Sequence, residues 1–128
     1  MCLITFSKKP LVADTDIPCY KLLVKTNDGR LISPFQEMEY KIGEVNSAVD
    51  TVKKPFSICG ATYIEGGYLH GYNIDVGIRL ISHANFSLHT KGELRLYKGY
   101  IPKDTEYYLS TTNICGKDMF ISDEYEII

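Results

Sequence analysis

One stretch constrains the fold of this chain more than any other: Gly66 to Asn85, GGYLHGYNIDVGIRLISHAN. A glycine turn is followed by a short strand, Tyr68 to Tyr72, and then by a pattern that predicts a helix over about residues 73–84. Asn73 has the side chain of an N-cap, and Asp75 would lie in the first turn, where an acid suits the helix dipole. Apolar residues then recur at helical spacing, so one helix face is expected to pack on a sheet.

The rest of the chain has the pattern of strands and turns. Cys19–Lys25 has the length and residues of a buried strand, and Asn27–Arg30 has hairpin chemistry, because Asp-Gly tolerates positive φ angles. Glu93–Ile101 alternates polar and apolar residues, which indicates a strand with one wet face. Residues 44–54 carry a weak signal and are expected to form a loop. Shorter strands are expected at Leu3–Phe6, Leu31–Ile32, Tyr107–Leu109, Met119–Ser122 and Tyr125–Ile128, with a turn at Asn113–Asp118. The predicted fold class is α+β, a mostly antiparallel sheet packed against one main helix, in a single domain over residues 1–128.

Composition narrows the function classes. The net charge is −2 with both signs interspersed, so there is no basic stripe to neutralise a nucleic-acid backbone. No apolar run approaches the ~20 residues that span a bilayer. The first residues, MCLITFSKK, carry their lysines after the apolar run, which is the reverse of a signal peptide. We therefore expect a cytoplasmic protein that binds neither nucleic acid nor membrane.

The four cysteines, Cys2, Cys19, Cys59 and Cys115, are widely spaced in apolar contexts. There is no CxxC pair and no histidine at zinc-finger spacing, so we expect structural thiols and neither metal nor cofactor. Cys2 offers a sharper alternative. Removal of Met1 would make it an amino-terminal cysteine, whose own amine can act as base for its thiol, although Leu3 replaces the glycine typical of such glutamine-hydrolysing enzymes.

His70 is the most interesting ionisable residue. Period-two spacing places Tyr68, His70 and Tyr72 on one strand face, a stripe that could stack on and hydrogen-bond a planar or phosphorylated ligand. The neighbouring Gly71 would let a ligand or another backbone come close. The alternative is a histidine satisfied within a tyrosine-rich sheet. The catalytic residues, if the protein has any, stay unknown, because no Walker loop, GxGxxG or HExxH motif is present.

Several segments of the chain resemble, in the same order, a group of small uncharacterised proteins from Bacteroidetes and their phages. The matching pieces are MCLI, DIPCYKLL, ISPFQEMEYKIG, GGYLHGY, YIPKDTEYYLS and the closing ISDEYEII. In that group a serine usually stands where this chain has Gly71. The resemblance implies the domain and a phage- or mobile-element-associated setting, but it supplies no activity.

A fainter likeness is to the ADP-ribosyltransferase fold. An early strand there offers an aromatic and a basic residue, as Tyr20 and Lys21 do here, and a late strand runs into a turn similar to Ile101–Thr105. By this likeness Lys98 occupies the place of the catalytic glutamate, which reverses the charge that stabilises an oxocarbenium-like centre. The resemblance implies a degenerate copy that binds rather than reacts.

Three hypotheses of function follow. The first is a non-enzymatic binding module for a small molecule or protein partner, with Tyr20, Lys21, Tyr68, His70 and Tyr72 as candidate binding residues. The second is a structural or protein-interaction domain, which would show a flat apolar patch or an exposed sheet edge and self-association, so a homo-oligomer stays open. The third is an enzyme, either ADP-ribosyltransferase-like or dependent on Cys2.

Overall fold

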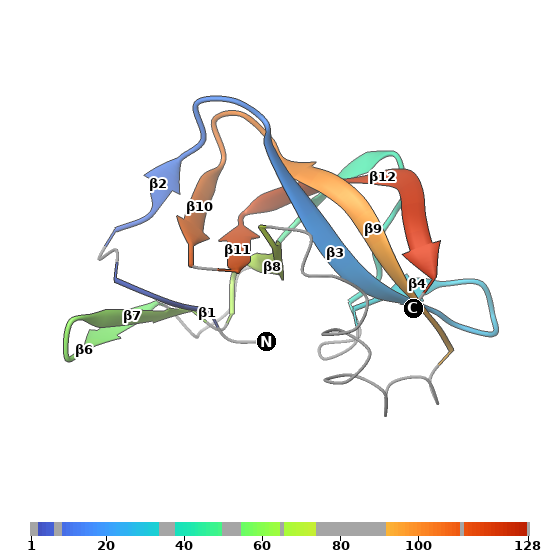
Figure 1. Ribbon diagram of the computed structural model, residues 1–128, viewed down its shortest axis with the longest axis horizontal. Helices are drawn as coiled ribbons and strands as arrows, with labels where there is room; N and C mark the ends of the chain where they lie inside the picture. Colours follow the sequence, from blue (N-terminus) through green and yellow to red (C-terminus); the bar gives the residue numbers. More distant parts are fainter. Residues whose placement is uncertain are drawn as a thin grey trace.

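The computed structural model describes residues 3–6, 9–33, 38–49, 55–64, 66–73, 92–110 and 112–127 (Figure 1). Within these ranges the chain forms strands and turns and no helix. The strands are β1 (Leu3–Thr5), β2 (Leu11–Val12), β3 (Ile17–Lys25), β4 (Leu31–Ile32), β5 (Glu44–Ser47), β6 (Phe56–Ile58), β7 (Ala61–Ile64), β8 (Leu69–Tyr72), β9 (Glu93–Ile101), β10 (Glu106–Leu109), β11 (Asn113–Gly116) and β12 (Asp118–Ile127).

The predicted α+β fold class is therefore wrong: the described part of the chain is all-β, and every pairing between its strands is antiparallel. The expected helix over residues 73–84 lies outside the described residues, except for Asn73. That residue stands in a bend, where its backbone N–H donates to Thr112 O at 3.0 Å and its Nδ2 donates to Ser110 O at 3.0 Å. Asn73 is thus tied to the connection between β10 and β11.

The strongest period-two and hairpin signals are confirmed. The predicted strand Cys19–Lys25 lies within β3, and Glu93–Ile101 is β9. These two strands pair over their whole length, from Ile17 opposite Ile101 to Lys25 opposite Glu93. The turn between β3 and β4 closes through Gly29, whose φ of 89° needs a residue without a Cβ.

Three local expectations are wrong. Glu44–Ser47, expected as part of a loop, forms β5 and pairs with β12. Asn113–Gly116, expected as a turn, forms β11, a central strand of the sheet. The two closing strands, Met119–Ser122 and Tyr125–Ile128, are instead one strand, β12, with an irregularity in its middle.

Asn46 explains why a polar segment becomes strand β5. Its Oδ1 accepts from the N–H of Lys41 at 2.9 Å, and its Nδ2 donates to the carbonyls of Lys41 at 3.0 Å and Glu44 at 3.2 Å. This buried amide satisfies backbone groups that would otherwise be left without partners in the turn before β5. A tertiary contact of this kind leaves no period in the sequence.

The strands form two sheets. The main sheet has the order β2-β10-β11-β8-β3-β9-β12-β5, with β4 beside β3, and the small sheet has the order β1-β7-β6. Figure 1 shows the small sheet at one end of the molecule, away from the long strands β3, β9 and β12. The small sheet packs on the main sheet through a cluster of buried residues: Leu3, Ile64, Tyr68, Tyr108 and Cys115.

The main sheet curls so that strands distant in its order touch. A Cβ on Gly71 of β8 would lie 3.4 Å from Cε of Met119 in β12, although β3 and β9 stand between these strands in the sheet. A Cβ on Gly116 of β11 would lie 2.9 Å from Cδ1 of Ile101 in β9. The two glycines make room for the side chains that fill the concave face.

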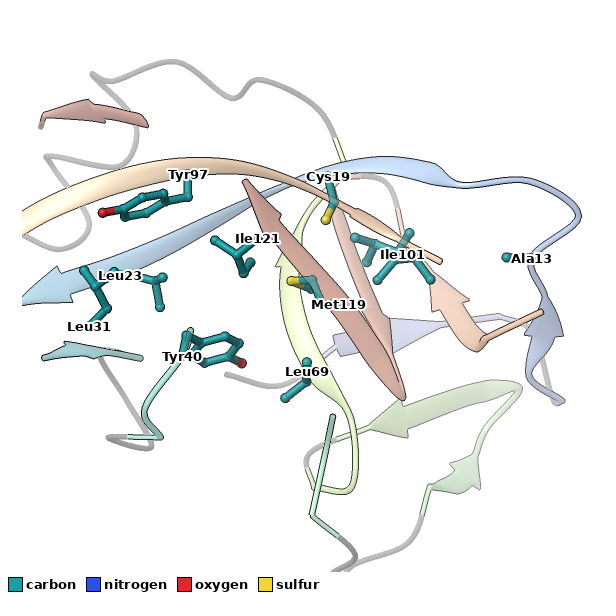
Figure 2. Packing of buried hydrophobic residues seen from close by; sticks show 11 residues of the cluster. Ala13, Cys19, Leu23, Leu31, Tyr40, Leu69, Tyr97, Ile101, Met119 and Ile121 are labelled. Atoms are coloured by element: carbon teal, nitrogen blue, oxygen red, sulfur yellow. The ribbon is translucent and has the colours of Figure 1, made fainter. Parts of the chain in front are cut away.

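That concave face holds the largest core cluster, which Figure 2 shows gathered between the strands. Leu23, Ile101, Met119 and Ile121 are fully enclosed there, and Tyr40 closes the cluster from the segment between β4 and β5. Each such aliphatic side chain contributes about 1.5–3 kcal/mol of transfer free energy. The opposite face of β3 and β9 carries a second cluster: Leu22, Val24, Ile32, Leu94 and Leu96, with Tyr20 and Tyr72 against it.

Candidate functional site

The irregularity in β12 creates the most distinctive surface feature of the described residues. Ile121 pairs with Gly99 and Tyr125 pairs with Tyr97, so three residues of β12 stand opposite the single residue Lys98 of β9. Bulges of this kind re-aim side chains and often adjoin functional sites. We call residues 122–124 the β12 bulge.

Hydrogen bonds from Ser122 hold the β12 bulge in shape. Its Oγ donates to the carbonyl of Lys98 at 2.8 Å, which replaces a ladder bond lost where the register shifts. The same Oγ accepts from the N–H of Glu124 at 3.3 Å. The backbone of the bulge is therefore fixed, and the side chains of Asp123 and Glu124 are left exposed.

An aromatic contact fixes the end of the β12 bulge. The ring of Tyr125 lies 5.0 Å from the ring of Tyr97, and the Arg95 guanidinium lies 4.3 Å from the Tyr125 ring centroid. Arg95 in turn donates from Nη1 to Tyr97 Oη at 3.0 Å and from Nε to Glu93 at 2.6 Å. The hydrogen bond to Tyr97 raises the pKa of Arg95, so the cation over Tyr125 is permanent.

A pocket of about 490 Å³ opens beside the bulge, within the range of small-molecule sites. We call it the bulge pocket; its described lining is Tyr20, Leu96, Lys98, Asp123, Glu124, Tyr125 and Glu126. Strand register explains this grouping, because Tyr20 pairs with Lys98 and Leu96 pairs with Glu126. Leu96 is buried and Tyr20 half-buried, so they provide an apolar base, whereas the β12 residues provide a charged rim.

The rim of the bulge pocket is acidic. Asp123, Glu124 and Glu126 give three negative charges against one positive charge from Lys98, a local sum of −2. Lys98 Nζ lies 3.9 Å from Glu124 Oε2, and both side chains are more than half exposed. An exposed pair at that distance is weak, so the two side chains can rearrange around a ligand. The electrostatics favour a cationic group above an apolar base.

The structure brings the residues that the sequence proposed for binding into two pairs, Tyr20 with Tyr72 and Lys21 with His70. Tyr20 of β3 and Tyr72 of β8 are direct partners across the strands, and both pack against the Leu22 cluster. The neighbouring Gly71 allows this pairing, because a Cβ there would lie 2.7 Å from the carbonyl oxygen of Tyr20. The expectation that Gly71 admits another backbone is confirmed. Of the five proposed residues, Tyr20 alone is in the described lining of the bulge pocket.

Tyr68 and His70 lie elsewhere and are buried. Tyr68 precedes β8, and its ring packs edge to face with the ring of Tyr108, with the two ring centroids 5.4 Å apart. Lys117 Nζ lies 4.4 Å from the centroid of the Tyr68 ring. Burial raises the pKa of Tyr68 to about 12. Tyr68 also lines a smaller hollow of about 220 Å³. His70 pairs with Cys115 in the sheet.

Lys21 points to the opposite face of β3 from Tyr20. It is buried, and its Nζ donates to the carbonyl of His70 at 2.6 Å and lies 5.1 Å from the ring centroid of Tyr40. Burial lowers the pKa of Lys21 to about 8. Lys21 thus belongs to the core beneath β8, and it joins β3 to β8 by a side-chain bond.

Sequence reasoning missed Asp123, Glu124 and Glu126 as site residues. The signal was present, because the two strands predicted at Met119–Ser122 and Tyr125–Ile128 leave Asp123 and Glu124 between them. In this gap the period-two pattern of buried and exposed residues is interrupted. If the gap is interpreted as a bulge within one strand, the sequence predicts that Asp123 and Glu124 protrude from the sheet.

Two of the predicted structural thiols, Cys19 and Cys115, are buried, and burial raises the pKa of Cys19 to about 12. Cys59 is exposed, so that prediction is wrong for it; Cys2 lies outside the described residues. Across the described ranges, no group of three or more His, Cys, Asp or Glu side chains is placed to hold a metal ion. His83 and His89 lie outside these ranges. The described residues contain no helix that is long and apolar enough to cross a membrane.

Comparison with known proteins identified no relative of this chain. No protein-family model matches the chain, and neither a curated protein nor a solved structure does. The resemblances to the Bacteroidetes and phage group and to the ADP-ribosyltransferase fold therefore stay predictions.

Proposed function

We propose that the protein is a non-enzymatic binding module whose ligand is a small molecule with a cationic group on an apolar body. The observation that carries this proposal is the bulge pocket. Its volume of about 490 Å³ suits a small molecule, its base is Tyr20 and Leu96, and its rim carries three carboxylates. An ammonium or guanidinium group would lie at the rim, and the apolar body would lie on the base.

The kinds of residue around the pocket favour binding over catalysis. Its described lining holds no serine, cysteine or histidine, and the groups in it that could transfer a proton, Lys98 and the three carboxylates, are exposed to solvent rather than enclosed. Lys98, which the ADP-ribosyltransferase likeness places where a catalytic glutamate would stand, is in the lining and largely exposed. The acidic rim repels phosphates. The charge of the ligand therefore distinguishes this proposal, which expects a cation, from a degenerate ADP-ribosyltransferase-like fold, which would bind a nucleotide.

A thermal-shift screen tests the proposal with three probes: phenethylamine, phenylacetate as its charge-reversed match, and ADP-ribose. At a hundred times its dissociation constant a ligand stabilises the fold by about 2.7 kcal/mol, which is seen as a rise in Tm. We expect a rise with phenethylamine and little with the other two. A rise with ADP-ribose and none with the amine would instead support the nucleotide-binding alternative.

Variants locate the site. Changing Glu124→Gln together with Glu126→Gln removes two rim charges while keeping the shape of the side chains, and should abolish most of the amine-dependent shift. The matched control is Glu106→Gln on β10, an exposed carboxylate outside the described lining. If the double variant responds to the amine as the wild type does, the ligand does not bind at the bulge pocket.

Our proposal keeps the cytoplasm as the setting, and the phage or mobile-element association as a prediction from resemblance. The thiols of Cys19 and Cys59 are not joined in disulfides, which supports a reducing compartment.

A further inference from the structure

The outer face of the small sheet consists of apolar side chains. Strand pairing places Leu3, Thr5, Thr62 and Ile64 on the inner face, toward the main sheet. The alternate residues Ile4, Phe56, Ile58, Ala61 and Tyr63 face outward, and Phe6 follows directly after β1 with its side chain exposed. We call these six residues the outer face.

The outer face is open to solvent. Phe6 is 85% exposed, Ile58 55%, and Ile4 and Phe56 each 49%. Phe56 stacks on Tyr63 with ring centroids 5.3 Å apart, so the two aromatic rings pack together on this face. None of these six side chains is charged, whereas the solvated face of an antiparallel sheet usually carries polar and charged side chains. A contiguous exposed patch of this kind marks an interaction site.

We propose that the outer face packs against the same face of a second copy of this chain, as two sheets face to face in a two-fold dimer. A two-fold interface sets the same surface patch of both copies against each other, so a patch that carried charge of one sign would repel itself. The outer face meets this condition, because all six of its side chains are uncharged. Sheets that pack face to face bury such apolar surfaces about 10 Å apart.

The available area predicts a weak dimer. A phenylalanine side chain presents roughly 200 Å² when fully exposed, so at the exposures given above the two phenylalanines and two isoleucines offer on the order of 400 Å² per copy. Two copies would bury about 800 Å² from these four side chains, to which Ala61, Tyr63 and the strand backbone add. Stable complexes bury about 1,200–2,000 Å², so we expect a weak dimer whose formation depends on protein concentration.

The inference is independent of the proposed ligand. The outer face belongs to β1, β6 and β7, whereas the bulge pocket belongs to β3, β9 and β12 at a different part of the molecule (Figure 1). A protein that dimerises without binding the amine, or the reverse, separates the two proposals.

Sedimentation velocity of the full chain over a wide concentration range tests the dimer. We expect the mass to rise from 14.5 kDa toward twice that value. Phe56→Asp and, separately, Phe6→Asp should weaken association about tenfold or more, since each puts an unpaired carboxylate from both copies into an apolar interface. Phe6 is so exposed that its substitution cannot prevent folding through lost burial. The matched control is Val45→Asp, because Val45 lies on β5, outside the outer face, and is 51% exposed. The Val45→Asp protein should dimerise as the wild type does.

Three outcomes would overturn the inference. The first is a wild-type protein that stays at 14.5 kDa throughout the concentration range. The second is that the Phe6→Asp and Phe56→Asp proteins associate as strongly as the wild type. The third is a monomer that floats with phosphatidylcholine–phosphatidylglycerol vesicles and loses this binding on Phe6→Asp, which would assign the outer face to a lipid surface.

Discussion

Replacing Lys21 by methionine should remove a specific pH dependence from the free energy of unfolding. Burial lowers the pKa of Lys21 from 10.5 to about 8 in the folded protein, while the unfolded chain keeps the ordinary value. Between these two values the unfolded chain holds a proton that the folded protein has lost. The unfolded state then binds more protons, so stability rises with pH.

The size of the effect follows from the size of the shift. The whole span between a pKa of 8 and 10.5 corresponds to about 3 kcal/mol, at 1.36 kcal/mol per unit. Integration over the early part of this titration gives about 0.8 kcal/mol of gain between pH 7 and pH 8.5. Above this window Cys19 opposes the gain. Its pKa is raised from 9.0 to about 12 by burial, so its contribution to stability is lost as pH rises beyond 9.

Urea unfolding at several pH values between 7 and 8.5 measures the difference in free energy between wild type and Lys21→Met. Taking the difference cancels every group that titrates alike in both proteins. We expect the wild type to gain about 0.8 kcal/mol relative to the variant across this range. A difference that stays constant with pH would show that Lys21 is not buried beneath His70, and the placement of β3 against β8 would be wrong.

Three further substitutions test the packing. Gly71→Ala would place a Cβ 2.7 Å from the carbonyl oxygen of Tyr20, so it should cost about 2–3 kcal/mol in urea unfolding, and a cost below about 0.5 kcal/mol would contradict the close approach. Asn46→Ala leaves the backbone groups of Lys41 without their partner and should lower Tm by an amount equivalent to about 2 kcal/mol; an unchanged Tm would show that water replaces the amide. His70→Ala should destabilise the protein by about 2 kcal/mol yet leave the amine-dependent thermal shift intact, whereas loss of the shift in a folded variant would return the ligand site to His70.

The sequence predicted the parts of the fold that local patterns control. The alternation in Glu93–Ile101 predicted β9 and the apolar run before Lys25 predicted β3, and Asp28-Gly29 predicted the hairpin after β3. Each of these signals is carried by residues within a few positions of one another. The pairing of β3 with β9 then joins segments about 76 positions apart, as for Lys21 and Tyr97, and no local period encodes that.

The predictions that were wrong depended on distant contacts. The strand β11 forms from a segment with turn chemistry, because β8 and β10 pair with it on both sides and Gly116 admits Ile101. The α+β prediction depended on the amphipathic stretch at residues 73–84, which was expected to form a helix that covers one face of the sheet. In the described residues, the curl of the main sheet and the small sheet supply the cover.

The candidate site could be predicted only in part. Tyr20 was proposed and lies in the bulge pocket, but the period-two argument that joined Tyr68 and His70 to Tyr72 could not show that the first two are buried. A strand pattern reports which residues share a face. It does not report which face is covered, since that depends on a second sheet formed by residues far along the chain.

The central claim is that a cationic small molecule binds at the β12 bulge, and an NMR titration of ¹⁵N-labelled protein with phenethylamine tests it most directly. The account predicts saturable amide shifts concentrated at Asp123–Glu126 and at Leu96–Lys98, with phenylacetate giving none. An absence of shifts, or shifts that cluster around Tyr68 and His70 instead, would contradict it.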